Sequence, residues 1–118
     1  MKNDFIPYEQ ALALKELGFD EPCYGWFDTG HLRFGCYESE YVTGLGDLPA
    51  PLYQQAFRWF REKHGLRHFI EYDYGYYIAL IQPPLVYSHG DTYEEAELAC
   101  LKKLIEISTE TNNPQTKP

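Results

Sequence analysis

Three stretches of the chain place apolar residues at the 3.6-residue spacing of a helix that buries one face. They span residues 8–17, 51–64 and 92–107, and the first two stop at a glycine. The third begins with Thr92 and Glu95, which have the spacing of a capping box, where side chains bind free N–H groups of the first turn. The pattern therefore predicts three amphipathic helices.

Between these helices lie two pairs of segments with the alternation of half-buried strands, each pair joined by a turn that contains glycine. Residues 23–28 and 31–37 form the first predicted hairpin, and residues 66–72 and 76–82 form the second. A two-residue turn in the first hairpin brings six mainly apolar residues to one side in pairs: Cys23 with Cys36, Gly25 with Phe34, and Phe27 with Leu32. The buried side of the second hairpin should include three residues: Leu66, Ile70 and Tyr72.

The predicted fold is α+β in the order αββαββα, with two antiparallel hairpins in a small sheet packed by the three helices. The 118 residues fit a single domain, placed at residues 1–108, and the polar residues 109–118 are expected to be a disordered tail. Residues 38–48 and 82–91 are predicted loops, because glycines or prolines interrupt them. Similar helix starts and turns recur 45 residues apart, which leaves open either a duplicated αββ unit or a coincidence.

Charge and hydropathy limit the kinds of partner and the cellular location to be expected. The chain has 18 acidic and 10 basic residues, and its net charge of −8 repels phosphate backbones, which argues against a nucleic-acid partner. No apolar run approaches the ~20 residues that span a bilayer, so no membrane partner is expected. Three cysteines match neither a zinc pattern nor a disulfide framework. We therefore expect a small acidic protein of the reducing cytoplasm, with its oligomeric state left open.

The residue types that most often carry catalysis form no motif in this chain. His31, His68 and His89 are far apart and lack the spacing of a metal site. The cysteines fall on predicted apolar faces, as small buried side chains do. No catalytic residue, metal ligand or cofactor is predicted, and a small enzyme with a site assembled from the distant histidines is kept as an alternative.

Aromatic residues are the unusual feature, since they make up 17% of the chain. Tyr24, Trp26 and Tyr37 are predicted to lie on an open sheet face with Arg33, and Trp59 is predicted at the edge of the second helix. Tyr, Trp and Arg are enriched at the centres of protein interfaces, whereas aromatic rings on a sheet can also stack on bases. These five residues form the candidate interaction patch.

Residues 50–63 (APLYQQAFRWFREK), residues 92–106 (TYEEAELACLKKLIE) and the opening PYEQAL at residues 7–12 resemble segments of small uncharacterised proteins of phages and mobile elements of gut bacteria. No activity is known for these proteins, so the resemblance implies a setting and no site residues. The leading hypothesis is a non-catalytic protein-interaction module, an accessory product of a phage or mobile element. The alternative is a nucleic-acid-related role, as a base-stacking sheet or as an acidic decoy of a DNA-binding protein.

Overall fold

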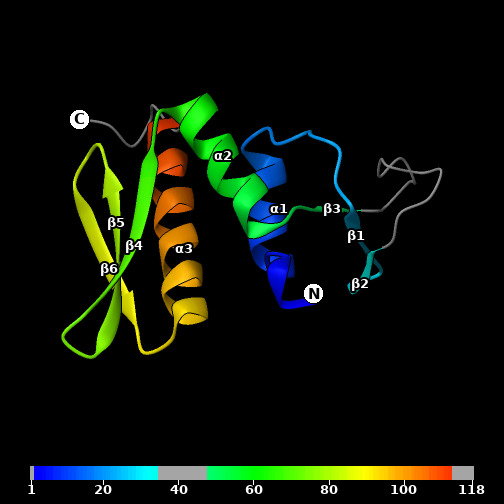
Figure 1. Ribbon diagram of the computed structural model, residues 1–118. Helices are drawn as coiled ribbons and strands as arrows, with labels where there is room; N and C mark the ends of the chain where they lie inside the picture. The colour runs from blue at the N-terminus through cyan, green and yellow to red at the C-terminus, as the bar shows by residue number, and fades with distance from the viewer. Residues whose placement is uncertain (1, 35–47, 113–118) are drawn as a thin grey trace. The chain divides into compact units, whose positions relative to one another are not determined.

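A computed structural model describes residues 2–34 and 48–112 of the chain (Figure 1). The fold is α+β, as predicted, and the order of helices and hairpins follows the prediction. The chain divides into two compact units, Met1–Ala56 and Phe57–Pro118. Each unit has a three-stranded antiparallel sheet of its own, and this separate pairing accounts for the division.

The described residues of the first unit form three strands, a short 3-10 helix, one complete α-helix and the start of another. Its elements are a short 3-10 helix η1 (Lys2–Asp4), α1 (Tyr8–Glu16), β1 (Gly25–Asp28), β2 (His31–Phe34), β3 (Leu48–Ala50) and the first residues of α2 (Tyr53–His64). The sheet has the order β2-β1-β3, with β1 antiparallel to both neighbours. Phe5 stacks on Phe34 with ring centroids 5.2 Å apart, and Tyr8 meets Phe27 edge-on at 5.3 Å. The N-terminal segment thus packs on the apolar face of this sheet.

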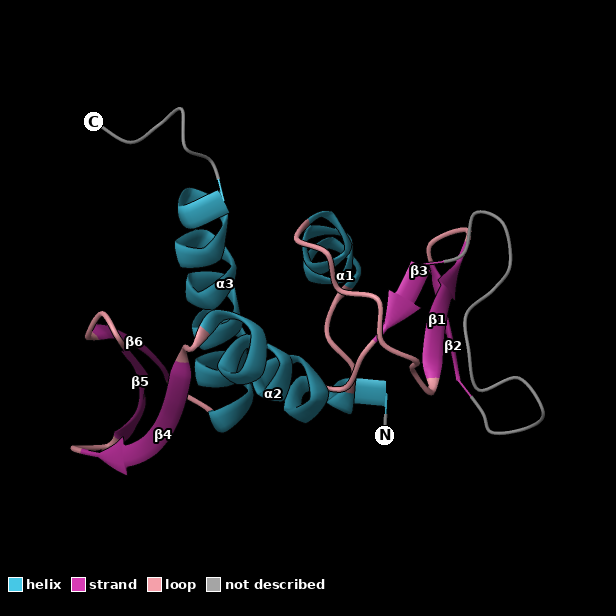
Figure 2. Ribbon diagram, turned by 90° about the horizontal axis from the view of Figure 1, so that it is seen from above, coloured by secondary structure: helices cyan, strands magenta, loops and turns pink. Residues whose placement is uncertain are grey.

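The second unit contains the remainder of α2, a three-stranded meander and one long helix. Its strands are β4 (Arg67–Asp73), β5 (Tyr76–Gln82) and β6 (Val86–Gly90), in the order β4-β5-β6, and α3 (Tyr93–Asn112) follows them. Figures 1 and 2 show α3 lying along one face of this sheet. That face carries the buried side chains of Ala79 and Ile81, and α3 contributes four buried apolar residues: Ala96, Cys100, Leu101 and Leu104.

Both hairpins turn through two residues with positive φ, the conformation of a type I′ turn. The values are 50° at Thr29 and 86° at Gly30, and 55° at Tyr74 and 87° at Gly75. The register predicted for the first hairpin is confirmed for two pairs: Gly25 with Phe34, and Phe27 with Leu32. Cys36 lies outside the described residues. In the second hairpin Asp73 belongs to the strand, because it pairs with Tyr76.

Two strands occupy stretches that were predicted as loops or left unassigned. β3 starts at the end of the predicted loop 38–48, and β6 lies within the predicted loop 82–91. Prolines 83 and 84 do end β5, but the chain turns back after them and pairs again with β5. A proline therefore marked the end of one strand and not the end of the sheet.

The third helix begins as predicted and ends later. The Glu95 N–H donates to Thr92 Oγ1 at 3.1 Å, and Glu95 Oε1 accepts a hydrogen bond from the Asp91 N–H at 2.9 Å. The first of these bonds is that of a capping box, and the second differs from it because the N–H of Asp91, and not that of Thr92, donates to Glu95. The helix continues to Asn112, four residues into the predicted disordered tail, and residues 113–118 lie outside the described part.

The start of α3 lies very close to β6 at Gly90. A Cβ added at Gly90 would be 2.7 Å from the Ala96 nitrogen and 2.7 Å from the Glu95 Cβ. Contacts between carbon atoms are normally about 3.5–4.0 Å. A side chain larger than hydrogen at position 90 would therefore separate the strand from the helix.

The two sheets are built from hairpins of the same kind but differ in topology. In the first unit the third strand, β3, pairs with the first strand, β1. In the second unit the third strand, β6, pairs with the second strand, β5. The similarity at a 45-residue offset therefore extends to the helix starts and the turns, and not to the strand order.

Candidate functional site

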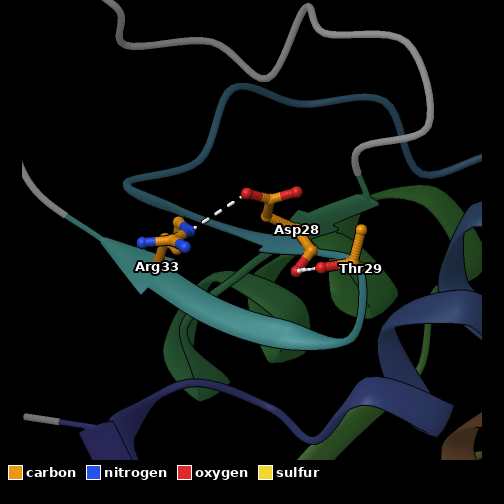
Figure 3. A network of polar contacts seen from close by, with 3 residues as sticks. All are labelled: Asp28, Thr29 and Arg33. Carbon is orange, nitrogen blue, oxygen red and sulfur yellow. Dashed lines mark hydrogen bonds and ion pairs between the residues drawn. The ribbon is translucent and has the colours of Figure 1, made fainter.

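The patch predicted from the sequence is only partly assembled on the first sheet. Trp26 lies opposite Arg33 across β1 and β2, so these two side chains share a face. Arg33 Nε donates to Asp28 Oδ2 at 3.1 Å, and the Thr29 hydroxyl donates to the Asp28 carbonyl at 2.6 Å (Figure 3). Asp28 thus compensates the charge of Arg33, which weakens its attraction for a phosphate group.

Of the other members of this patch, Trp59 is placed differently from the prediction. Tyr24 is 57% exposed, and Tyr37 lies outside the described residues. Trp59 is only 3% exposed, so its predicted position at the edge of the second helix was wrong. Its ring meets the rings of Phe60 and His64 edge-on, each with centroids 5.0 Å apart. Trp59 is therefore a core residue and offers no surface to a partner.

The second sheet presents a different surface, which sequence reasoning missed. Residues alternate between its two faces, and the cross-strand register places Phe69, Leu80 and Tyr87 in one row on the side opposite α3. Phe69 is 47% exposed and Tyr87 is 60% exposed. Within the described part of the second unit, Figures 1 and 2 show no helix on this side. We call this surface the outer face and define its apolar and aromatic part by six residues: Phe69, Tyr76, Ile78, Leu80, Tyr87 and His89.

Charged residues on the outer face are separated by sign along β4. Arg67 lies at the start of the strand, whereas Glu71 and Asp73 lie toward its end. All three are exposed. Since residues 67, 69, 71 and 73 point to the same side of a strand, the positive and negative ends flank the exposed ring of Phe69.

The histidines are not brought together by the sheet. His68 lies on the inner face of β4, opposite Ile81, and its ring stacks on Phe57 with centroids 3.9 Å apart. His89 lies on the outer face of β6, with its ring 5.4 Å from that of Tyr76. Two imidazoles on opposite faces of one sheet cannot act on the same substrate atom.

Burial explains why His68 favours its neutral form. Burial lowers the pKa of this histidine below its usual value of 6.5, and the nearby positive charge of Arg61 lowers the pKa further. Burial also lowers the pKa of His64. Both histidines therefore favour the neutral form and have a structural role in the packing of the second unit. His31, the third of the histidines considered for an enzyme, is exposed on β2 in the first unit.

The described cysteines are buried side chains of the two cores. Burial raises the pKa of the Cys23 thiol to about 12, with a contribution from the charge of Glu21. Burial raises the pKa of Cys100 to about 12 as well, and the charge of Glu97 adds to it. A thiol with such a pKa forms almost no thiolate near neutral pH, so neither cysteine is an activated nucleophile. The Cys23 thiol donates to the Glu21 carbonyl at 3.4 Å.

Within residues 2–34 and 48–112, no group of three or more His, Cys, Asp or Glu side chains is arranged to hold a metal ion. In the same part of the chain, none of the helices combines the length and the apolar character that crossing a membrane requires. The chain matches no protein-family model, no curated protein and no solved structure. No relative therefore describes the outer face of the second sheet, and its role is inferred from its residues and their geometry.

Proposed function

We propose that this protein is a non-catalytic protein-binding module, and that the outer face of the second sheet is its binding surface. One observation carries the proposal: the row of Phe69, Leu80 and Tyr87 lies on a sheet face that α3 does not cover. Large exposed apolar groups that adjoin one another mark interaction sites on soluble domains. Aromatic rings in particular contribute large contact areas at interface centres.

The composition of the outer face favours a protein over a nucleic acid. Aromatic rings on an open sheet can stack on bases, but proteins that bind in this way surround the rings with positive charge. Here Glu71 and Asp73 adjoin the rings, and the only positive charge on the face's described strands is Arg67. The chain as a whole carries a net charge of −8. Repulsion of phosphates therefore opposes base stacking at this surface.

The setting completes the proposal. The resemblance of residues 50–63 and 92–106 to proteins of phages and mobile elements supports an accessory role for the module in such an element. The free, buried thiols of Cys23 and Cys100 suit the reducing cytoplasm of a bacterial host.

A site-specific cross-linker tests the position of the binding surface. A photo-reactive phenylalanine analogue replaces Tyr87 in the full-length protein, which is then irradiated in host-cell extract. Two further versions carry the analogue at Tyr24, on the first patch, and at Tyr74, which is 87% exposed at the β4–β5 turn. We expect a discrete protein adduct from position 87 alone. The adduct should disappear when Phe69→Ser is added and circular dichroism shows that the fold is kept.

Other outcomes of the cross-linking contradict the proposal. An adduct from position 24 alone would move the binding surface to the first sheet. Equal adducts from all three positions would show that capture is unspecific. An adduct that nuclease treatment removes would favour the nucleic-acid role, and no adduct from position 87 would remove the outer face as a binding surface.

A further inference from the structure

We infer that the outer face of the second sheet binds the same face of a second copy of this chain. This inference rests on the proposed function, because it names the partner of that surface. The argument starts from the distribution of charge along β4. Arg67 and Asp73 are six residues apart, which is about 20 Å along a strand, and Glu71 lies between Phe69 and Asp73.

A surface with opposite charges at its two ends is complementary to itself after reversal. Closed dimers are most often built on a two-fold axis, which places one patch against the same patch of the other copy. If the axis is perpendicular to the strands, each strand faces its own copy running in the opposite direction. Arg67 of each chain then lies over Asp73 of the other, so both ends of the interface pair opposite charges, and Phe69 of each chain lies over Glu71 of the other.

The apolar part of the outer face fits the same arrangement. Leu80 lies opposite Phe69 and Ile78 lies opposite Glu71, so the midpoint between Arg67 and Asp73 falls between these two rows. Reversal about that midpoint places Leu80 over Ile78 of the second copy, at the centre of the interface. Aligned sheets pack in this way, face to face, with their strand directions within about 30° of each other.

At the edge formed by β6, reversal brings two rings together. Tyr87 shares a row with Leu80, and His89 shares a row with Ile78, so Tyr87 lies over His89 of the second copy. A phenol and an imidazole can stack and can exchange a hydrogen bond. The charges at the two ends, the aliphatic contact and the ring contact therefore agree on one arrangement.

The dimer should be weak, because the face is only three strands wide. Strands are about 4.8 Å apart, and two faces of this width bury much less than the ~1,600 Å² of a standard interface. We expect a dissociation constant on the order of 100 µM, between the micromolar and millimolar values of weak association. The measurement is sedimentation equilibrium of the full-length chain from about 5 µM to about 1 mM, a range chosen to bracket that value.

A mixing experiment with charge reversals tests the arrangement itself. Arg67→Glu alone and Asp73→Arg alone each place like charges at both ends of the interface, so each should dimerise at least about tenfold more weakly than the unaltered chain. An equimolar mixture of the two variants restores an opposite pair at both ends. We expect the mixture to recover the association of the unaltered chain. Tyr74→Ser, which removes an exposed ring from the turn, serves as the control and should leave association unchanged.

Each remaining outcome overturns the inference. A chain that stays monomeric up to about 1 mM would remove the second copy as the partner. A dimer that neither reversal weakens would use another surface. Weakening by both reversals without recovery in the mixture would exclude the two-fold arrangement. A monomer that still gives the adduct from position 87 with a host protein would keep the proposed function and overturn only this inference.

Discussion

Replacing Gly90 by alanine tests how the second unit holds its sheet and helix together. The added Cβ would lie 2.7 Å from the Ala96 nitrogen and 2.9 Å from the Glu95 carbonyl carbon, both of which are backbone atoms. Backbone atoms at the start of a helix cannot rotate away as a side chain can. To reach an ordinary separation, the first turn of α3 must move by about 1 Å.

The expected loss follows from two opposing effects. Overfilling a well-packed contact costs about 1–3 kcal/mol. The backbone at Gly90 has no positive φ, so alanine fits its conformation and stiffens the unfolded chain, which recovers about 0.4–1 kcal/mol. Because the overlap involves the backbone, we place the net loss in unfolding free energy at about 2 kcal/mol. A loss of this size lowers the Tm of a unit of this length by about 10 °C.

Tryptophan fluorescence provides an assay that is specific to the second unit. Trp26 belongs to the first unit and Trp59 to the second, so a Trp26→Phe background leaves one fluorophore, which reports on the unit that contains Gly90. Urea unfolding is followed by this signal in the presence and absence of Gly90→Ala. The control is Ser88→Ala on the same face of the same strand. It removes a buried hydroxyl that has no hydrogen-bond partner among the described residues, so it should be neutral or slightly stabilising.

Two results would refute this reasoning. A loss below about 0.5 kcal/mol, well under the usual cost of overpacking, would mean that α3 does not lie against β6 at Gly90. A comparable loss in Ser88→Ala would mean that β6 tolerates no substitution, whatever its size. Gly25→Ala, which lies in the first unit and is therefore followed by circular dichroism, offers a further comparison. Its Cβ would meet the Phe5 ring at 2.6 Å, and because a ring can shift, we expect a smaller loss than at Gly90.

Three more predictions concern the cores. Phe60→Ala and Trp59→Ala should each lower the unfolding free energy by about 3–5 kcal/mol, because both side chains are buried; urea unfolding followed by circular dichroism measures the loss. A loss at Trp59 less than half that at Phe60 would place Trp59 at the edge of the helix, as the sequence predicted. Cys23 and Cys100, with pKa values raised to about 12, should react slowly with a thiol reagent near neutral pH and quickly after denaturation. Mass spectrometry of the labelled peptides measures both rates, and fast labelling of the native protein would contradict the burial of these thiols. Burial lowers the pKa of His68 in the folded state, so as the pH drops the unfolded chain binds a proton at His68 before the folded chain does. The urea midpoint should therefore fall as the pH drops through 6.5, and His68→Phe should flatten this dependence. An unchanged slope in His68→Phe would argue against the burial of His68.

The hairpins were accessible from the sequence because two independent signals agreed. A turn with glycine at its second position fixes the loop length, and alternation then fixes which residues face each other. This reasoning pairs Gly25 with Phe34, and the first sheet contains the same pair. The capping box at Thr92 and Glu95 was equally readable, because it depends on two side chains at a fixed spacing.

The outer face was not accessible, because it depends on a strand that the sequence obscured. Two prolines precede β6, and the strand itself alternates Val86, Ser88 and Gly90 with Tyr87 and His89, so neither face is clearly apolar. Glycine at position 90 resembles a turn residue, whereas its role is to admit the start of α3. Because β6 was not predicted, the sequence could not show that Tyr87 lies in one row with Phe69 and Leu80. It also could not show which face of the sheet α3 covers.

The prediction of burial was wrong for the second helix because it assumed that only one face of the helix is buried. Adjacent helical positions are about 100° apart, so a single apolar stripe places only one of Trp59 and Phe60 inward. The structure buries both. For Tyr72 the opposite occurred: it follows Ile70 on the inner face of β4, but it lies beside the turn and is largely exposed. Alternation assigns a face, and the extent of the covering helix decides whether that face is buried.

Alternation in β4 has a consequence for how the protein can change over evolutionary time. Even-numbered residues such as His68 and Ile70 maintain the core, while odd-numbered ones such as Phe69 and Glu71 form the exposed surface. Substitutions at odd positions can therefore alter what the surface recognises without disturbing folding. A single-residue insertion would exchange the two sets and damage both properties at once. Divergence among related chains should accordingly accumulate in β4 as replacements at odd positions, with the strand's length held constant.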